Sequence, residues 1–351
     1  MPAHRRPSVR RGVAVLALAS VLAACTADPV QVDNTPAPSP SADATRPSAS
    51  PEPTPTATAT ARPDSAADAP RSEPTGFYDA GSQADGQVAQ LEAAGRQADA
   101  DAIRRIAEQP VATWVGEWMQ DVTGSVAGIT RGAADAGQVA LLVVYAIPGR
   151  DCGLHSAGGV AADQYLDFVR GFADGIESGS QTWVVLEPDA LAQMGECDGQ
   201  GDRAGLLAGA AEILDEAGAE VFLDAGHSGW HAGDEVIARL ETVGTEHLAG
   251  FSTNTSNYQR TEDERAWAAP IADATGLEFI VDTSRNGNGS NGEWCNPSGR
   301  AIGEAPRILD DGPMRAVAWV KAPGESDGTC NGGPAAGQWW MEGALALAGA
   351  A

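Results

Sequence analysis

The chain has 351 residues, with 48 Asp and Glu against 22 Lys and Arg, so its formal net charge at pH 7 is −26. An acidic surface of this kind argues against nucleic acid and anionic membranes as partners, because both carry negative phosphate groups. The charge suits an exported protein that acts on a neutral substrate.

The N-terminal segment carries the features of an export signal. Four arginines lie within residues 5–11, an apolar run occupies residues 13–24, and Cys25 follows. A basic start, a short apolar core and a small-residue exit predict a signal peptide over residues 1–24. The run is too short to span a bilayer. Residues 22–25 read LAAC, which resembles the lipobox of bacterial lipoproteins and predicts lipidation of Cys25; the alternative is an ordinary cleaved signal with an incidental cysteine.

Residues 25–76 are rich in Pro, Ser, Thr and Ala and contain almost no large apolar side chain. Such a segment cannot bury enough apolar surface to offset the entropy lost on ordering, so we expect a disordered linker. We expect this linker to tether a folded domain, residues 77–351, outside the cell or on the outer face of the cell membrane.

From residue 111 onward, short apolar runs alternate with helical patterns. The runs occupy residues 111–115, 140–145, 182–187, 220–225, 248–254, 277–282 and 316–321. Between them, residues 163–176, 203–218 and 262–276 repeat apolar side chains at three- and four-residue spacing, which is typical of amphipathic helices. Gly218 and Gly276 stand where helix C-caps are expected.

This alternation predicts an α/β fold. Continuous apolar strands between helices indicate a parallel sheet that helices cover. Seven strands favour a TIM-barrel-like (β/α) barrel, and a doubly wound open sheet is the alternative. The early glycine-rich loop of a dinucleotide-binding sheet is missing. In a barrel the loops after the strands carry the chemistry.

Carboxylates and tryptophans gather where the apolar runs end. The residues at these ends are Trp114, Trp118, Tyr145, Arg150, Asp151, Glu187, Asp189, Asp224, His227, Trp230, Asn254, Asn257, Asp282, Arg285, Trp294, Lys321, Glu325 and Asp327. Indole faces stack on the apolar faces of sugar rings, and carboxylates act on the glycosidic oxygen. The combination therefore predicts a carbohydrate-cleaving site. Each residue also has a structural interpretation, because aspartates often cap helices and tryptophans often belong to the core.

The cysteines and histidines indicate disulfides rather than a metal site. The cysteines after Cys25 are Cys152, Cys197, Cys295 and Cys330. An even number in an exported domain predicts two disulfides, with three possible pairings. His227 and His231 are four residues apart, a spacing that binds metal on some helices. The intervening Gly229 and Trp230 argue against a regular helix, and no third ligand is evident, so we expect no metal and no cofactor.

Seven segments resemble glycoside hydrolase family 6. The two longest are VVYAIPGRDC at residues 143–152 and VVLEPDAL at residues 184–191. The others occupy residues 222–231, 252–258, 281–289, 293–303 and 319–328. The resemblance covers essentially all of residues 77–351, in order. It implies a distorted barrel of seven strands and an enzyme that cleaves β-1,4-glucan with inversion.

The same resemblance implies roles for individual residues. Asp189 matches the general acid, and Asp151 matches an aspartate that keeps this acid protonated. Tyr145 matches a tyrosine that presses on the sugar at the cleavage point. Asp327 matches a proposed general base, in a family where a water relay is the competing explanation. Asp224 matches an aspartate that supports binding and catalysis.

The resemblance also implies substrate contacts and a disulfide pairing. Sugar-stacking positions match Trp114, Trp230 and Trp294, and polar contacts match His227, Asn254, Lys321 and Glu325. Ser156 is the candidate for a serine contact after Asp151, although the register puts Ala157 at the expected place. The implied disulfides join Cys152 with Cys197 and Cys295 with Cys330.

Loop lengths favour an endo-acting enzyme. The connections at residues 197–203 and 303–314 are short, which predicts an open cleft rather than a tunnel. The alternatives are an exo-acting cellobiohydrolase and a lipoprotein that binds cello-oligosaccharides without cleaving them; the aspartates present argue against the latter. We expect a monomer whose partner is β-1,4-glucan and which meets the membrane only through lipid on Cys25.

Overall fold

The fold is that of a computed structural model, which describes residues 74–349, apart from the side chains of residues 310 and 311. The expected signal peptide, Cys25 and the linker up to residue 73 lie outside the described residues. Within residues 74–349, no helix is long and apolar enough to cross a membrane.

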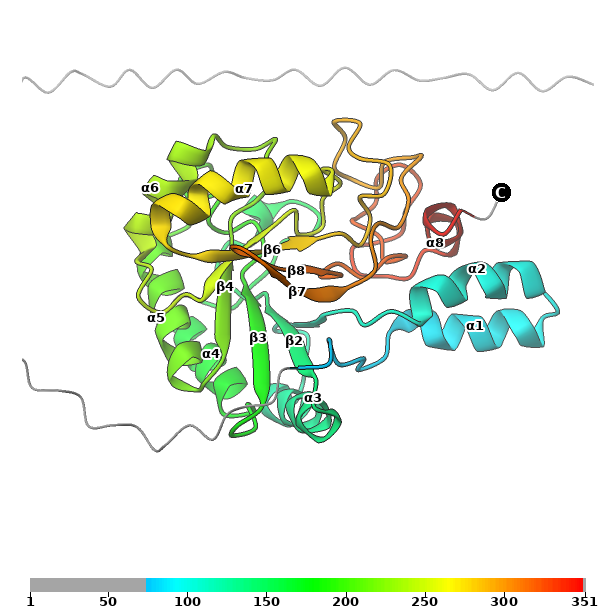
Figure 1. The fold of residues 1–351 in the computed structure, drawn as a ribbon, viewed down its shortest axis with the longest axis horizontal. Helices are drawn as coiled ribbons and strands as arrows, with labels where there is room; N and C mark the ends of the chain where they lie inside the picture. Colours follow the sequence, from blue (N-terminus) through cyan, green and yellow to red (C-terminus); the bar gives the residue numbers. More distant parts are fainter. Residues whose placement is uncertain (1–73, 350–351) are drawn as a thin grey trace, which may run out of the picture. The chain divides into compact units, whose positions relative to one another are not determined.

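Eight strands form one curled sheet (Figure 1). They are β1 (Thr113–Val115), β2 (Val139–Val144), β3 (Gln181–Leu186), β4 (Glu220–Asp224), β5 (Gly250–Thr253), β6 (Glu278–Asp282), β7 (Arg307–Asp311) and β8 (Met314–Ala318). Their order across the sheet is β1-β2-β3-β4-β5-β6-β8-β7. All neighbouring pairs are parallel except β7 with β8. Each of the seven predicted apolar runs forms a parallel strand, so the expected distorted α/β barrel is confirmed.

The antiparallel strand β7 lies in a segment that the sequence reading treats as a connection. The sequence Asp-Asp-Gly at residues 310–312, where β7 ends and the turn begins, has the composition of a loop. Gly312 adopts φ +63°, which turns the chain back so that β7 pairs with β8. The hairpin adds an edge strand without changing the order of the seven parallel strands.

The curl brings the two ends of the parallel sheet together. The Ala112 N–H donates to the Trp319 carbonyl at 2.9 Å, and the Trp114 indole N–H donates to the Val320 carbonyl at 2.7 Å. These contacts join the segment at β1 to the segment that follows β8. The loops after β1 and β8 therefore lie side by side at the C-terminal end of the barrel.

Both faces of the central strands are buried, as their continuous apolar sequences predict. On β3, Val184 and Leu186 pack with the surrounding helices, whereas Trp183 and Val185 pack with Phe222 in a second cluster. The helices between successive strands are α3 (Val122–Ala136), α4 (Tyr165–Ala173), α5 (Arg203–Glu216), α6 (Gly233–Val243) and α7 (Thr261–Thr275). The three predicted helices match α4, α5 and α7, and Gly276 is the left-handed C-cap of α7.

A helical hairpin beside the barrel is absent from the sequence predictions. It consists of α1 (Gln83–Ala93) and α2 (Gln97–Ala107), and it packs with α8 (Met341–Leu347) in a separate apolar cluster that includes Trp319 (Figure 1). Ser82 and Asp85 form a capping box at the start of α1.

Several residues at the C-terminal ends of the strands adopt left-handed backbone conformations. Asp151, Glu187, Asp189 and Asn254 have φ between +47° and +69°. Non-glycine residues persist in this region only where their surroundings hold them, and such positions concentrate in functional loops. The local backbone therefore singles out the loops after β2, β3 and β5.

Candidate active site

A cleft of about 800 Å³ opens at the C-terminal ends of the strands. All of the predicted catalytic and binding residues line it except Asp224 and Asn254. Those that line it are Trp114, Tyr145, Asp151, Ser156, Asp189, His227, Trp230, Trp294, Lys321, Glu325 and Asp327. Residues on loops that are distant in sequence thus converge at one mouth, as a parallel barrel predicts.

Asp189 projects into the cleft above Asp224, which is the last residue of β4 and fully buried. Asp224 Oδ1 accepts the backbone N–H of Asp189 at 2.9 Å, and its Oδ2 accepts the Ser252 hydroxyl at 2.9 Å. Burial raises the pKa of Asp189 well above its usual value, and the charges of Asp224, Asp151 and Asp327 raise it further. Asp189 therefore keeps its proton to a higher pH than an ordinary aspartate does.

The charge of Asp224 raises the pKa of Asp189 more than the charge of Asp151 does, although the family resemblance emphasises Asp151. Its own pKa is raised to about 6 by burial, against the opposing hydrogen bonds from Thr255, Ser252 and backbone N–H groups. Asp224 consequently becomes an anion only above about this pH. It supports Asp189 from below and does not line the cleft.

Glu187 ties together the loops that carry Asp189 and Asp151. It is fully buried, and both of its carboxyl oxygens accept the Ala146 N–H, at 3.0 and 3.1 Å. Burial raises the pKa of Glu187 to about 7, and the Ala146 and Ile147 N–H groups oppose that rise. Because it lies below the cleft, Glu187 is a structural partner.

Asp151 begins the short 3₁₀ helix η1 (Asp151–Gly153), and its Oδ2 accepts the Ser156 N–H at 2.7 Å. The disulfide between Cys152 and Cys197 anchors this loop to the segment that follows Asp189. Gln200 braces the segment after Asp189 itself by donating to the Gln193 carbonyl at 2.7 Å. The loop bearing Asp151 is thus fixed next to the general-acid candidate.

Arg150 organises the aromatic wall around Tyr145. Its guanidinium donates to the Tyr145 carbonyl at 2.6 Å, to the Ser156 carbonyl at 2.8 Å and to both carboxyl oxygens of Glu117 at 2.7 and 3.0 Å. The Tyr145 ring lies edge-to-face with Trp114 at 5.0 Å. Burial raises the pKa of the Tyr145 hydroxyl well above its usual value, so it stays protonated.

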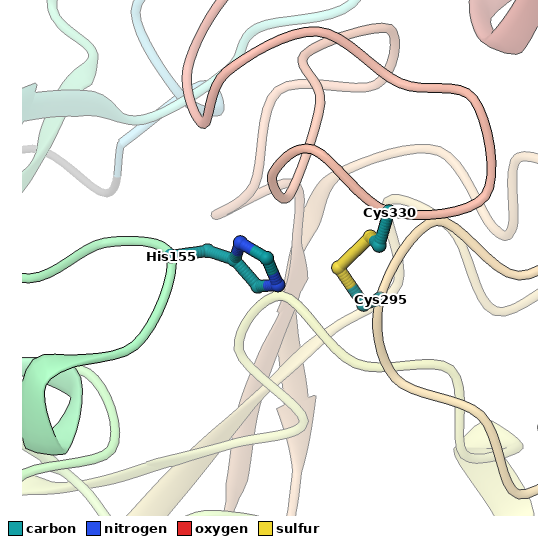
Figure 2. A group of neighbouring side chains, drawn as sticks. All are labelled: His155, Cys295 and Cys330. Atoms are coloured by element: carbon teal, nitrogen blue, oxygen red, sulfur yellow. A yellow bond between two sulfur atoms is a disulfide. The ribbon is translucent and has the colours of Figure 1, made fainter. Parts of the chain in front are cut away.

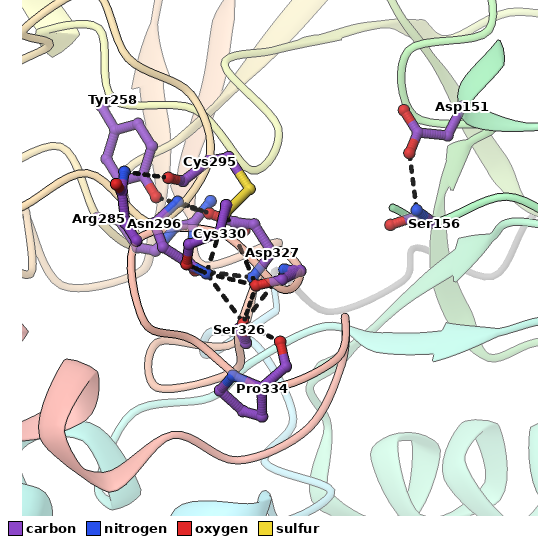
Figure 3. The surroundings of a disulfide bond; sticks show 12 residues. Asp151, Ser156, Tyr258, Arg285, Cys295, Asn296, Ser326, Asp327, Cys330 and Pro334 are labelled. Atoms are coloured by element: carbon purple, nitrogen blue, oxygen red, sulfur yellow. Dashed lines mark hydrogen bonds and ion pairs between the residues drawn. A yellow bond between two sulfur atoms is a disulfide. The ribbon is translucent and has the colours of Figure 1, made fainter. Parts of the chain in front are cut away.

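Asp327 is held as an anion by a dense set of donors (Figure 3). The Arg285 guanidinium donates to Oδ1 at 2.8 Å, and the Tyr258 hydroxyl and Asn296 N–H each donate to Oδ2 at 3.0 Å. Burial favours the protonated form, but the charges of Arg285 and Lys321 outweigh it and keep the pKa of Asp327 below its usual value. In return, the Asp327 N–H donates to Asn296 Oδ1 at 2.8 Å.

The second disulfide joins Cys295 to Cys330 and lies beside Asp327 (Figure 3). Both pairings implied by the family resemblance are therefore confirmed. His155 approaches this disulfide from the loop after β2 (Figure 2). His155, Cys295 and Cys330 form a close group, but both sulfurs are bonded to each other, so this group is not a metal site. The His155 ring also lies 5.7 Å from the Trp294 ring.

Lys321 and Glu325 form the wall next to Trp114. The Lys321 ammonium lies 3.4 Å from Glu325 Oε2 and 5.8 Å from the centre of the Trp114 ring. Gln83, at the start of α1, donates to Glu325 Oε1 at 2.7 Å. The helical hairpin therefore positions a predicted substrate contact.

His227 and Trp230 line the cleft after β4. Burial and the neighbouring His231 lower the pKa of His227 to about 4, so the ring is neutral near pH 7. Because His227 Nδ1 accepts the Gly229 N–H at 3.1 Å, its Nε2 carries the proton and serves as a donor. His231 Nε2 lies 2.8 Å from the Ala192 carbonyl oxygen, with which it forms a hydrogen bond.

Asn254 does not reach the cleft. Its side chain is fully buried, donates to the Asp282 carbonyl at 2.7 Å and accepts the Gln259 N–H at 2.9 Å. These bonds hold the loop after β5 against the end of β6. The structure gives Asn254 a structural position instead of the expected place beside the glucan.

The sequence predictions assigned no role to several residues whose hydrogen bonds hold the site side chains in place. Gln83, Glu117 and Asn296 hold Glu325, Arg150 and Asp327, respectively. Asn296 lies next to Cys295 in the segment at residues 293–303 that resembles the family, so the sequence could have indicated its role. Gln83 lies outside any such segment, and its contact spans 242 residues, so only the fold reveals it.

The comparisons with known proteins agree with this geometry. The model of the family "Glycosyl hydrolases family 6" matches residues 75–351. Endoglucanase A of Cellulomonas fimi is 54% identical over 250 residues, which cover 70% of this chain and 55% of that protein. Endoglucanase 1 of Streptomyces halstedii is 40% identical over 301 residues, covering 80% of this chain and 91% of that protein. The chain thus spans about half the length of the first relative and most of the second.

Solved structures resemble this fold as well. The endoglucanase Cel6 of Mycobacterium tuberculosis, in complex with methyl-cellobiosyl-4-deoxy-4-thio-β-D-cellobioside, superposes with a TM-score of 0.71 at 36% identity. The match covers 79% of this chain and 97% of that one. Two relatives named as cellobiohydrolases are 31% and 26% identical to this chain. The family model, these relatives and the shared fold together show that this chain belongs to glycosyl hydrolase family 6.

Proposed function

We propose that this protein is an inverting endo-β-1,4-glucanase that hydrolyses cellulose or soluble β-1,4-glucans. The observation that carries the proposal is Asp189, a carboxyl group whose pKa is raised by burial and by Asp224 in a cleft lined by tryptophans. A general acid that works near neutral pH needs a raised pKa. In this proposal Asp189 donates its proton to the glycosidic oxygen as the bond to the anomeric carbon breaks.

Asp327 supplies a negative charge close enough to raise the pKa of Asp189. Its pKa is below the usual value, and both of its oxygens already accept hydrogen bonds, so it is a weak base but a permanent anion. An anion of this kind stabilises the positive charge of the oxocarbenium-like transition state. Water forms the new bond to the anomeric carbon from the opposite face, and its proton passes to solvent, through Asp327 or a second water.

The remaining cleft residues suit a neutral polysaccharide. Trp114, Trp230 and Trp294 offer aromatic faces for glucosyl rings. His227 Nε2–H and the Lys321 and Glu325 pair offer donors and acceptors for sugar hydroxyls. Relatives that are 37–54% identical are named endoglucanases, whereas the two named as cellobiohydrolases are 31% and 26% identical, which supports the endo mode over the exo mode.

A timed product profile on cellohexaose, with anomers detected by NMR, tests this function. We expect internal cleavage and the α-anomer as the first product, because inversion places water on the face opposite the leaving oxygen. The Asp189→Ala variant should bind cellohexaose while losing hydrolysis. Release of the β-anomer first, or wild-type turnover by Asp189→Ala, contradicts the mechanism; binding without any reducing-sugar release indicates a non-catalytic glucan-binding protein.

An exo-acting cellobiohydrolase is the second candidate, and one observation favours it. His155, on the loop after β2, contacts Trp294 on the loop after β6, and a Cβ atom at Gly328 would lie 2.4 Å from His155 Cγ. Both rings line the cleft, so their contact joins two of the loops around it, as an enclosed, exo-acting site requires. Cellobiose as nearly the sole early product, without a rapid viscosity drop in carboxymethylcellulose, supports this second reading.

We also propose export and lipid attachment at Cys25, from the basic start, the apolar run and the LAAC segment. Labelling with a fatty acid analogue tests the attachment. Label on the wild-type protein that disappears in Cys25→Ser supports it, and a secreted, unlabelled wild-type protein contradicts it.

A further inference from the structure

Trp118 is an exposed aromatic side chain that none of the functions above employs. It lies three residues beyond the end of β1, lines the cleft and is 53% exposed. Leaving so much of an indole in water is unfavourable unless a ligand covers it, and exposed apolar groups inside a cleft mark binding surfaces. The position therefore calls for a ligand with an apolar face.

The backbone supports the Trp118 ring from one side. A Cβ atom at Gly116 would lie only 2.2 Å from Cζ3 of the indole, so the ring rests directly on the Gly116 backbone. A side chain at position 116 would push the ring away. The absence of a side chain at Gly116 thus allows the indole to lie directly against the loop after β1.

Arg150 holds the same ring relative to Tyr145. Its guanidinium carbon lies 5.2 Å from the centre of the Trp118 ring and 4.5 Å from the centre of the Tyr145 ring. Arg150 is only 5% exposed, and Glu117 fixes it through two hydrogen bonds. The Trp118 ring is therefore preorganised next to the wall that surrounds the predicted cleavage point, so binding there requires little loss of side-chain freedom.

We propose that Trp118 forms an additional glucosyl-binding subsite, in which its exposed surface stacks on the apolar C–H face of a pyranose ring in β-1,4-glucan. The subsite lies beside Arg150, whose guanidinium contacts both the Trp118 ring and the Tyr145 ring. This inference rests on the proposed function, because that function supplies the glucan. It predicts that only chains long enough to reach Trp118 gain from it.

A ladder of cello-oligosaccharides from cellotriose to cellohexaose tests the subsite. Binding is measured by calorimetry on the Asp189→Asn protein, in which hydrolysis does not interfere, with and without Trp118→Leu. We expect Trp118→Leu to lower the affinity for the longer oligosaccharides by about tenfold, which is the contribution of one aromatic contact. The affinity for the shortest oligosaccharide that binds should not change. Trp118→Phe keeps an aromatic face and should restore most of the affinity, which separates stacking from bulk.

Two outcomes overturn the subsite. Equal affinity with and without Trp118→Leu at every length excludes stacking. An equal loss at every length shows that Trp118 acts by supporting Arg150, and a lowered melting temperature accompanies that result. Hydrolysis of the same ladder by the wild-type protein is scored separately. Failure to cleave any oligosaccharide rejects the proposed function, whereas the binding ladder alone decides the role of Trp118.

Discussion

The backbone N–H of Asp189 donates a hydrogen bond to the buried carboxyl group of Asp224 at 2.9 Å. Asp224 ends β4, and Asp189 lies three residues beyond the end of the neighbouring parallel strand β3, so the two carboxyl groups lie close together. Two carboxyl groups in a buried site cannot both ionise without repulsion, so the upper one retains its proton. The barrel thereby gives Asp189 the raised pKa that the proposed general acid requires.

Replacing Asp224 with Asn should move the alkaline limb of the pH profile of kcat/KM to lower pH. Above about pH 6 Asp224 is an anion that raises the pKa of Asp189, and Asn removes this charge while keeping an acceptor for the Asp189 N–H. A lower pKa means that Asp189 loses its proton at lower pH. The plateau rate should fall far less than the roughly 10²–10⁴-fold expected for Asp189→Asn. An unmoved alkaline limb would show that burial alone raises the pKa of Asp189.

Replacing Glu187 with Gln should change the pH dependence of stability. The pKa of Glu187 is about 7 in the folded protein and 4.5 ordinarily, so between these values the folded state keeps a proton that the unfolded chain releases. Stability of the wild type therefore falls as pH rises through this window, by up to about 3 kcal/mol, and Glu187→Gln lacks this contribution. Urea unfolding of both proteins from pH 4.5 to 7.5 measures the difference. Parallel curves would contradict a raised pKa at Glu187.

Replacing Arg285 with Gln should raise the pKa of Asp327, because it removes a positive charge 2.8 Å from Oδ1. If activity requires ionised Asp327, the acid limb of the pH profile of kcat/KM then moves to higher pH. Breaking a buried ion pair also costs about 3–5 kcal/mol of stability. Tyr258→Phe is the milder companion variant, since it removes one hydrogen bond and no charge, and its acid limb should move in the same direction by less. An acid limb that stays in place in both variants would exclude ionised Asp327 as a requirement.

The two disulfides should stabilise the fold similarly, and loss of the Cys295 to Cys330 bond should lower kcat less than loss of the Asn296 side chain. They join residues 45 and 35 positions apart, so losing either should cost about 4 kcal/mol in the chain-entropy model. Without the Cys295 to Cys330 bond, the reciprocal hydrogen bonds of Asn296 still hold Asp327. We expect Asn296→Ala, with this disulfide intact, to lower kcat more than Cys295→Ser with Cys330→Ser. Measuring kcat and the unfolding free energy for both variants checks this, and the reverse ranking would refute it.

The sequence by itself determined the seven parallel strands and the set of residues at their ends. Runs such as residues 182–187 are apolar throughout because both faces of a barrel strand are buried. Parallel strands present their C-terminal ends on one side, so Asp151, Asp189 and Asp327 were predicted to share a mouth, and the structure brings them there. Local patterns suffice for this because a continuous apolar run followed by a helical pattern can be recognised from neighbouring residues alone.

Only the tertiary structure decided what surrounds each of these residues. Asp224 lies beneath Asp189. Arg285 and Asn296 form hydrogen bonds with Asp327, and Gln83 forms one with Glu325. Asn254, which ends a strand like the others, turned inward to bond the Asp282 carbonyl. The physical reason is that pKa and side-chain direction depend on burial and on charges a few ångströms away, and those neighbours come from loops that the sequence separates by tens to hundreds of residues.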